Sequence, residues 1–256
     1  MFERFYTPAS SFAGDIDGLI LLILAFTGFW FVLAEVVFLW LIVKFRAKDG
    51  VKTQYITGEQ KSEKKWVSLP HYLVLVCDIF ILVGALRVWM DVKLTMPTPD
   101  AEIRVHGQQW AWSFVHPGKD GKLDTDDDIR TVEELHVEVG KTYRFILSSA
   151  DVLHSFSVPA FRLKQDAVPG REITGWFKPT VAGTYDIQCA EICGVAHGIM
   201  EARIVVDTPV AHAKWVAAGG PTIYWQGSNV KNPSGARSAS AAPLPATTTS
   251  TLAQAL

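Results

Sequence analysis

Two long apolar runs near the beginning of the chain constrain its fold more than any other feature. The first, Leu19–Val43, has 25 residues and a single charge, Glu35, and the second covers residues 69–90 and includes Asp78. At a rise of about 1.5 Å per residue, each run is long enough to cross a hydrocarbon core about 30 Å thick. The sequence therefore predicts two transmembrane helices, over residues 19–43 and 69–90.

The connection between these runs, residues 44–68, is basic. It holds seven lysine and arginine residues against three acidic ones. Because short loops rich in Lys and Arg stay on the cytoplasmic side of a membrane, we expect this loop to be cytoplasmic. The N-terminal segment 1–18 and everything after residue 91 then face the outer side.

Glu35 and Asp78 are costly inside a bilayer and so need a reason to be there. Counted from the cytoplasmic ends of their helices, the two carboxyl groups lie at similar depths, about 12 and about 13.5 Å. Either they are protonated and hydrogen-bonded against a partner subunit, or they belong to a proton route. Both explanations imply a larger membrane partner.

After the second run, the pattern changes to short stretches in which apolar and polar residues alternate, separated by turn dipeptides. Strands are expected at Ile103–His106, Trp110–Val115, Glu133–Val139, Thr142–Ser148, Ser155–Val158, Glu172–Phe177, Gly183–Gln188 and Ala202–Val206. This spacing predicts an all-β sandwich or Greek-key barrel over residues 91–208. The extension 209–256 is expected to hold a short helix at Pro209–Ala218 and, from residue 228, a disordered tail rich in Ala, Ser, Thr and Pro.

One compact segment concentrates metal-binding side chains in the order C-x3-C-x3-H-x2-M. It contains Cys189, Cys193, His197 and Met200, and the whole chain has only three cysteines. Thiolate, thioether and imidazole ligands together suit copper. A disulfide between the two cysteines is the alternative, but it explains neither the histidine nor the methionine. The third cysteine, Cys77, lies in an apolar run and is expected to act as a small buried hydrophobe.

A copper site of this kind takes a further ligand from an earlier loop of the β domain. The candidates are four histidines, His106, His116, His136 and His154. His154 lies between two strand-like runs with apolar and aromatic neighbours. Beside the cysteine segment, it is the preferred ligand.

The charge pattern separates the two sides of the membrane. The formal net charge of −2, with no basic cluster outside the cytoplasmic loop, argues against a nucleic-acid partner. Residues 100–206 hold eleven basic and sixteen acidic residues, a balance of −5. An acidic surface serves solubility, or it steers a basic partner. The run that we name the aspartate cluster contains Asp124, Asp126, Asp127 and Asp128.

Four segments in order resemble subunit II of the haem-copper cytochrome c oxidases, and the resemblance covers about residues 19–206. These segments are Gly107–Trp112, Asp151–Pro159, Lys164–Arg171 and Cys189–Met200. The last is similar to the binuclear copper A loop of the family, and the second is similar to the segment that supplies its early ligand.

The resemblance implies a cupredoxin-like domain that holds two copper ions. Cys189 and Cys193 would bridge the ions through their thiolates. His154 and His197 would each complete one ion, with Met200 on one of them. On the other ion, the remaining ligand would be a backbone carbonyl.

That carbonyl would belong to Glu191, whose carboxylate would also reach a magnesium or manganese ion at the junction with subunit I. Asp166 and Arg171 would lie toward the same side, supported by Lys164. Trp110 would receive the electrons. Trp112 would support it as part of the docking surface, or it would serve core packing.

The resemblance also implies the docking and proton-transfer residues. Asp151 and the aspartate cluster would help to dock a basic cytochrome c. Glu63 belongs to an E-x-x-W-x-x-x-P motif at the start of the second helix. It would lie at the cytoplasmic mouth of a proton path, or form a surface ion pair with neighbouring lysines.

The implied function is that of a two-pass subunit of a proton-pumping cytochrome c oxidase in the bacterial inner membrane. Electrons from cytochrome c would pass through the copper centre to haem in subunit I for the reduction of oxygen to water. Subunit III would be a further partner. The copper domain and both termini would be periplasmic. No C-x-x-C-H motif occurs, so no haem is expected in this chain.

The sequence departs from the family pattern in three places. Glu201 and Ala202 follow Met200 where Pro-Ile is usual, Gln108 replaces a common His, and Ala111 replaces a common Tyr. The last two put in doubt how closely the docking surface follows the family. The rival functions are a quinol oxidase subunit II, which would lack the ligands present here, a nitric oxide reductase subunit with a similar copper domain, and a membrane-tethered copper-delivery protein.

Overall fold

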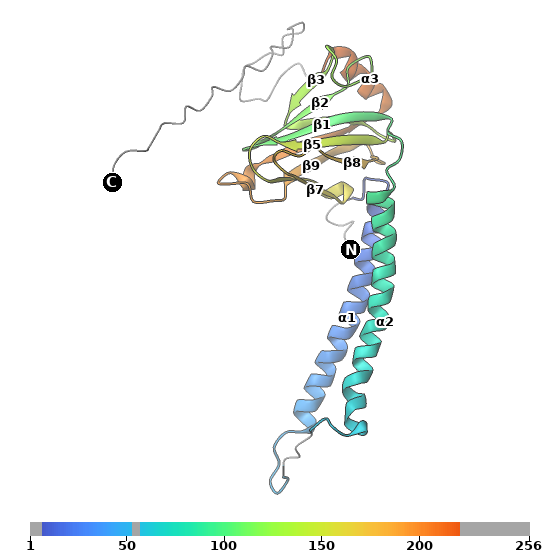
Figure 1. Cartoon of the computed structure of the whole chain (residues 1–256), viewed down its shortest axis with the longest axis vertical. Coiled ribbons are helices and arrows are strands. Elements are labelled where there is room, and N and C mark those ends of the chain that lie inside the picture. The colour runs from blue at the N-terminus through green and yellow to red at the C-terminus, as the bar shows by residue number, and fades with distance from the viewer. Residues whose placement is uncertain (1–6, 53–56, 221–256) are drawn as a thin grey trace, which may run out of the picture.

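The computed structural model of the chain describes residues 7–52 and 57–220, and it shows a helical hairpin that projects from a β domain (Figure 1). Helix α1 covers Ala13–Lys44. Helix α2 covers Lys61–Trp89 and continues as a turn of π-helix at Met90–Leu94. Both helices are long and apolar enough to cross a membrane. The predicted hairpin is therefore present.

The helix boundaries differ from the predicted ones. α1 begins at Ala13, six residues before the first apolar run, and α2 begins at Lys61, eight residues before residue 69. In α2, backbone hydrogen bonding continues past the apolar stretch, since the Lys and Glu residues of 61–68 are good helix formers. The segment 61–68, which we expected to lie in the cytoplasmic loop, is helical.

The two membrane carboxyl groups lie in different surroundings. Asp78 lines a groove of about 400 Å³ between α1 and α2, together with Thr27 and Trp30. The indole N–H of Trp30 donates to the Cys77 thiol across this interface, over 3.4 Å. Glu35 lies on an exposed part of α1. These positions leave both explanations for the two carboxyl groups open.

The β domain is a sandwich of two five-stranded sheets. One sheet has the strand order β3-β2-β1-β5-β8, and the other has the order β4-β10-β9-β6-β7. The strands are β1 Ala101–Gln108, β2 Ala111–His116, β3 Ile129–Val132, β4 Glu134–Glu138, β5 Tyr143–Ser149, β6 His154–Val158, β7 Leu163–Ala167, β8 Ile173–Phe177, β9 Gly183–Cys189 and β10 Glu201–Asp207. A helical hairpin followed by an all-β domain confirms the predicted fold class.

The sequence did not predict two of these strands, β3 and β7. β3 has only four residues and directly follows an aspartate-rich loop, while β7 reads Leu-Lys-Gln-Asp-Ala and is mostly polar. Both are edge strands of their sheets, paired on one side only. An edge strand buries fewer side chains, so its apolar alternation is weak.

Aromatic side chains fill the space between the sheets. Phe145 and Phe156 lie 5.8 Å apart between ring centroids, and Phe145 and Phe177 lie 6.1 Å apart. All three rings are fully buried. Gly175 gives Phe145 room, because a Cβ at that position would come within 2.3 Å of the ring. This core holds the loops at the ends of the sandwich in fixed positions.

The first turns of α1 and the residues before them fasten the hairpin to the base of the β domain. Ser10 donates its hydroxyl to the carbonyl of Phe161, over 2.8 Å. The guanidinium of Arg162 forms a two-pronged ion pair with Asp17 at 2.7 and 2.9 Å. On α2, the carbonyl of Val92 accepts the indole N–H of Trp176. The orientation of the domain over the hairpin is thus set by both helices.

Helix α3, Pro209–Ala218, closes the described part of the chain, as predicted. Thr208 caps its first turn by accepting the amide N–H of Ala211, and Gly219 ends it in a left-handed conformation. The predicted tail from residue 228 lies outside the described residues. Figure 1 shows α3 and the orange loop between β9 and β10 at opposite ends of the β domain.

Candidate metal centre

The cysteine segment forms the loop between β9 and β10. Cys189 is the last residue of β9, and Met200 directly precedes β10. The amide N–H of Cys189 donates to the carbonyl of Met200 over 3.1 Å, which closes the base of the loop. Inside the loop, the amide N–H of His197 donates to the carbonyl of Gly194, over 3.1 Å. The loop is therefore a compact turn on the end of a strand pair.

Inside this loop, sulfur and nitrogen atoms face one another. The two thiol sulfurs, of Cys189 and Cys193, lie 3.8 Å apart. The Cys193 sulfur lies 3.6 Å from Nδ1 of His197 and 3.8 Å from the thioether of Met200. The carbonyl of Glu191 lies 3.3 Å from the Cys189 sulfur. Both cysteines are buried and free, so the structure contains no disulfide between them.

The predicted early ligand joins this group from another strand. His154 is the first residue of β6, and β6 pairs with β9 so that Phe156 lies opposite Cys189. Nδ1 of His154 therefore comes within 3.9 Å of the Cys189 sulfur. Ligand atoms of His154, Cys189 and Cys193 all lie within 4.8 Å of one another.

Asp151 fixes the orientation of His154. Its carboxylate lies 2.9 Å from Nε2 of His154 and accepts the amide N–H of Gln109 over 2.7 Å. Burial acts to raise the pKa of Asp151, but these hydrogen bonds outweigh it and lower the pKa. A carboxylate on one ring nitrogen leaves the other nitrogen, Nδ1, directed at the thiols, as is usual for metal-binding histidines.

The donor set fits copper. For a tetrahedral ion with bonds of about 2.3 Å to sulfur and about 2.1 Å to nitrogen, two ligand atoms lie roughly 3.5 to 3.8 Å apart. The separations of 3.6 to 3.9 Å match that spacing. Burial and the neighbouring Cys189 thiol raise the pKa of Cys193 to about 11. A metal ion would therefore have to displace a proton from this thiol.

Trp110 lies beside this group on the turn between β1 and β2. Its indole N–H donates to the carbonyl of Cys193 over 3.3 Å, and its side chain is 38% exposed. Gly194 permits the approach, because a Cβ there would lie 3.1 Å from the indole ring. The indole ring thus connects the protein surface with the backbone of Cys193.

Trp112 is a correction to the predicted docking set. It is fully buried and packs edge-on against the ring of His154, with 6.0 Å between centroids. Position in the chain explains the difference, because Trp110 lies on the exposed turn before β2 while Trp112 is the second residue of β2, on the face that packs into the core. A side chain without exposed surface cannot contact a docking partner, and Trp112 supports the ligand histidine instead.

The aspartate cluster also lies elsewhere than we expected. It belongs to the loop between β2 and β3, at the end of β2 that is opposite to Trp110. A strand of six residues separates the two by about 20 Å. Asp124 is paired with Arg104 at 2.7 Å, and Asp127 accepts the hydroxyl of Thr125. These aspartates therefore lie at the other end of β2 from Trp110, and their part in docking stays a prediction.

The remaining predicted residues occupy separate surroundings. The Glu191 carboxylate is 39% exposed and lies 3.9 Å from the ammonium of Lys164, which is 3.7 Å from Asp166. Glu63 accepts the amide N–H of Gly58 over 2.9 Å. Within residues 7–52 and 57–220, Glu63 forms no ion pair with the neighbouring lysines.

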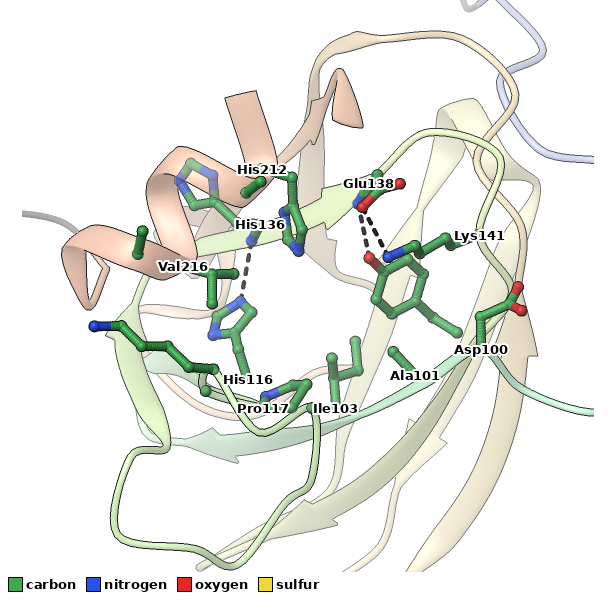
Figure 2. A pocket seen from close by; sticks show the side chains of 16 residues that line it. Asp100, Ala101, Ile103, His116, Pro117, His136, Glu138, Lys141, His212 and Val216 are labelled. Atoms are coloured by element: carbon green, nitrogen blue, oxygen red, sulfur yellow. Dashed lines mark hydrogen bonds and ion pairs between the residues drawn. The ribbon is translucent and has the colours of Figure 1, made fainter. Parts of the chain in front are cut away.

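The opposite end of the domain holds a second cavity, of about 370 Å³, under α3 (Figure 2). His116, His136 and His212 line it. Both ring nitrogens of His136 lie beside carboxylates, at 2.8 Å from Asp207 and 2.7 Å from Glu134. His116 was a candidate for the early copper ligand, whereas the sequence analysis did not single out His212. Here both imidazoles serve to pack α3.

These histidines are arranged for packing and not for metal binding. Nε2 of His116 accepts the amide N–H of His136 over 3.1 Å, while its Nδ1 lies 3.2 Å from the carbonyl of Ile129. Burial lowers the pKa of His116 to about 3, so it stays neutral. Trp215 of α3 stacks on the His136 ring at 4.4 Å. His106, the remaining candidate, is bonded to the Ser148 hydroxyl.

Comparison with known proteins agrees with this geometry. Residues 101–208 match the family model described as the periplasmic domain of cytochrome c oxidase subunit II. An alternative cytochrome c oxidase subunit 2 of Bradyrhizobium diazoefficiens is 33% identical over 82% of this chain and 82% of its own length. The cytochrome c oxidase subunit 2 of Cereibacter sphaeroides is 27% identical over 86% of this chain and 80% of its own.

Among solved structures, the periplasmic domain of cytochrome oxidase subunit II from Bradyrhizobium japonicum is 31% identical, with a TM-score of 0.44. The match covers 49% of this chain and 96% of that one. The sequence identity over most of the chain, together with the family match to the β domain, establishes the relationship. The chain belongs to the cytochrome c oxidase subunit II family and is a subunit of a haem-copper oxidase.

Proposed function

We propose that this chain accepts electrons from cytochrome c at a binuclear copper A centre and passes them to haem in subunit I, where oxygen is reduced to water. One observation carries the proposal. Five side chains with copper-binding atoms converge at one end of the β domain, and four pairs of those atoms lie 3.6 to 3.9 Å apart. A quinol oxidase subunit II, the rival function, would lack these ligands.

Each ligand has a distinct place in this set. Cys189 and Cys193 lie in the middle and would bridge two ions, since each thiol faces both the other thiol and a histidine. The thioether of Met200 approaches Cys193, and the carbonyl of Glu191 approaches Cys189. Copper held by these residues would supply one-electron transfer, and two thiolates shared between two ions would let the ions share the electron.

The surrounding residues keep the site rigid and dry. His154, Cys193 and Met200 are almost completely buried, which excludes water. Trp112 and Phe156 pack their rings against each other beside His154. Asp151 holds the imidazole of His154 in the orientation that the ligand role needs. A rigid site of this kind has little to rearrange when an electron arrives.

Trp110 is the residue that we propose to receive the electron. It is the aromatic side chain that joins the surface to the ligand loop, through its hydrogen bond to the Cys193 carbonyl. Asp151, on the adjacent loop, lies close enough to add a negative charge to the donor's docking surface. The aspartate cluster, at the far end of β2, is not included in this surface.

Glu191 faces the partner subunit in this proposal. Its carbonyl approaches the copper ligands while its carboxylate remains partly exposed. Magnesium prefers oxygen ligands and is usually bound by only one or two carboxylates. Glu191 would supply one such carboxylate to a magnesium or manganese ion, and subunit I would supply the other protein ligands.

The membrane arrangement follows from the hairpin. We propose that α1 and α2 cross the bacterial inner membrane, with the basic loop in the cytoplasm and the copper domain in the periplasm. Subunits I and III would pack against the hairpin. Glu63, held at the start of α2 by Gly58, lies where a proton path from the cytoplasm would begin.

Copper content and electron paramagnetic resonance of the full-length chain, purified in detergent and loaded with copper, test the proposal. We expect two copper ions per chain and a hyperfine pattern from one electron shared equally by two copper nuclei. A single copper ion with localised spin, or a colourless chain with an oxidised Cys189–Cys193 pair after copper loading, would contradict it.

A further inference from the structure

Gln109 contacts both segments that supply the copper ligands. It lies on the turn between β1 and β2, next to Trp110. Its side-chain amide N–H donates to the carbonyl of Cys193 over 2.8 Å, and its backbone N–H donates to the carboxylate of Asp151 over 2.7 Å. These two contacts join the loop after β9 to the loop before β6, although the two loops are far apart in sequence.

Each of these two contacts leads directly to a ligand atom. The Asp151 carboxylate that accepts the Gln109 N–H also lies 2.9 Å from Nε2 of His154. The carbonyl on the other side belongs to Cys193 itself, whose sulfur lies at the centre of the donor set. One residue therefore connects the isolated histidine with the cysteine loop.

The Cys193 carbonyl accepts two hydrogen bonds from neighbouring residues. The Gln109 amide is the shorter partner, at 2.8 Å, and the Trp110 indole is at 3.3 Å. Gly194 leaves the space for both, because a Cβ there would lie 3.0 Å from the Gln109 amide nitrogen. The Gln109 side chain thus fixes the carbonyl that Trp110 also contacts.

We propose that Gln109 is a positioning residue that sets the spacing between Trp110, the Cys193 thiolate and His154. The proposal rests on the copper function proposed above. Without the side-chain amide, the Cys193 carbonyl keeps only its longer bond to Trp110, and the exposed loop gains freedom. The ligand set and the link to Trp110 then loosen together.

The adjacent Gln108 provides a matched comparison. It has the same side chain and is also exposed, but its side chain makes no hydrogen bond to any residue in the described part of the chain. Replacement of a glutamine by methionine keeps the length and flexibility of the side chain and removes the amide. Q109M and Q108M therefore make the same chemical change, with and without loss of the bond to Cys193.

The test uses the oxidase complex that contains full-length wild-type, Q109M or Q108M chains. The resistance of copper to the chelator bathocuproine disulfonate is measured, with the reduction potential of the copper centre and the KM and kcat for a reduced c-type cytochrome. For Q109M we expect copper loss at about tenfold lower chelator concentration, because outer contacts of metal ligands matter on that scale. We also expect a shifted potential, a lower kcat and an unchanged KM.

The outcomes separate the possible roles of Gln109. A raised KM for Q109M with unchanged copper retention and potential would make Gln109 a docking residue and overturn the proposal. Equal effects of Q109M and Q108M would overturn it as well. If the wild-type complex itself shows no shared-electron copper signal, the proposed function fails first, and this result is visible before any variant is compared.

Discussion

The two ends of the β domain both bring histidines and a tryptophan together, but they leave the ring nitrogens in opposite states. At the ligand end, Nδ1 of His154 and Nδ1 of His197 face thiols at 3.9 and 3.6 Å, too far for a strong bond. At the α3 end, both nitrogens of His136 are bonded to carboxylates at less than 3 Å. At the ligand end, Nδ1 of each histidine thus faces a sulfur atom, whereas at the α3 end the ring nitrogens of His136 and His116 have hydrogen-bond partners.

This difference shows how a ligand histidine can be told from a packing histidine. Burial does not separate them, since His154 and His116 are both almost fully buried. The partners of the ring nitrogens do. A nitrogen bonded to the backbone or to a carboxylate already has its partner, whereas several soft donor atoms directed at one another at the spacing of metal ligands mark the place of a metal.

The largest effect is expected from removal of a bridging thiol. C193S replaces a sulfur that faces Cys189, His197 and Met200 with a weaker ligand, so we expect loss of the binuclear copper signal. Copper content and paramagnetic resonance measure this. C77S, which also removes one thiol but lies in the membrane hairpin, is the control and should keep two copper ions. Retention of the signal in C193S would refute the bridging assignment.

A smaller effect is expected when the histidine of the ligand end loses its carboxylate. D151N keeps the shape of the side chain but removes the charge that orients His154. We expect copper affinity to fall by roughly 10- to 100-fold. Chelator competition measures this affinity. E201Q, which neutralises an exposed carboxylate at the start of β10, should change the affinity little.

At the other end, we expect W215A to loosen α3 and to leave the copper centre as it is. Trp215 stacks on His136 and contacts His116 edge-on. Its truncation should cost about 2 kcal/mol of local stability. Hydrogen exchange of α3 amides would report the loss, and an altered copper spectrum would show that the two ends are coupled.

The α3 end should also respond to alkaline pH. Burial acts to lower the pKa of His136, but its bonds to Glu134 and Asp207 outweigh this, and the pKa is raised above 6.5. A raised folded pKa gives stability that is complete below about pH 6.5 and lost as the pH rises through the folded value. The protection of α3, corrected for intrinsic exchange, should therefore fall toward pH 9.

Two other histidines, His116 and His212, line the same cavity as His136. They limit the pH range over which the experiment reports on His136 alone. Burial lowers the pKa of His212, although Asp207 acts against it, so its contribution is lost only as the pH falls below about 6.5. His116 stays neutral throughout. Arg203, which pairs with Glu134 across β10 and β4, helps to lower the pKa of that carboxyl group. H136Q should remove the alkaline response; a response that persists in H136Q would assign it to another group.

The smallest effect is expected from the aspartate cluster. Asp126 and Asp127 lie at the α3 side of β2. At physiological ionic strength, charges are screened beyond about 8 Å. D126N and D127N should therefore change the KM for a basic cytochrome c by less than about twofold. Steady-state kinetics at two salt concentrations measure this. A marked, salt-dependent rise in KM would return the cluster to the docking surface.

The sequence predicted the parts of this molecule that depend on local pattern. Apolar length predicted the hairpin, alternation predicted eight of the ten strands, and the Pro209–Ala218 segment predicted α3. The prediction failed where apolar alternation was weak, and where the sequence pattern did not show where a helix begins or ends. The short edge strands β3 and β7 have little apolar alternation, and the helices run past their apolar stretches because backbone hydrogen bonding does not end with hydrophobicity.

By itself, the sequence determined the chemistry of the candidate centre, because four of its side-chain ligands lie within twelve consecutive residues. Only the tertiary structure decided that Trp112 is buried, that the aspartate cluster lies at the other end of β2, and that Gln109 connects the loops. The reason is geometric. A strand carries residues apart by about 3.3 Å at each step, so neighbours in sequence reach opposite ends of the domain. Pairing between strands brings distant residues such as Phe156 and Cys189 side by side.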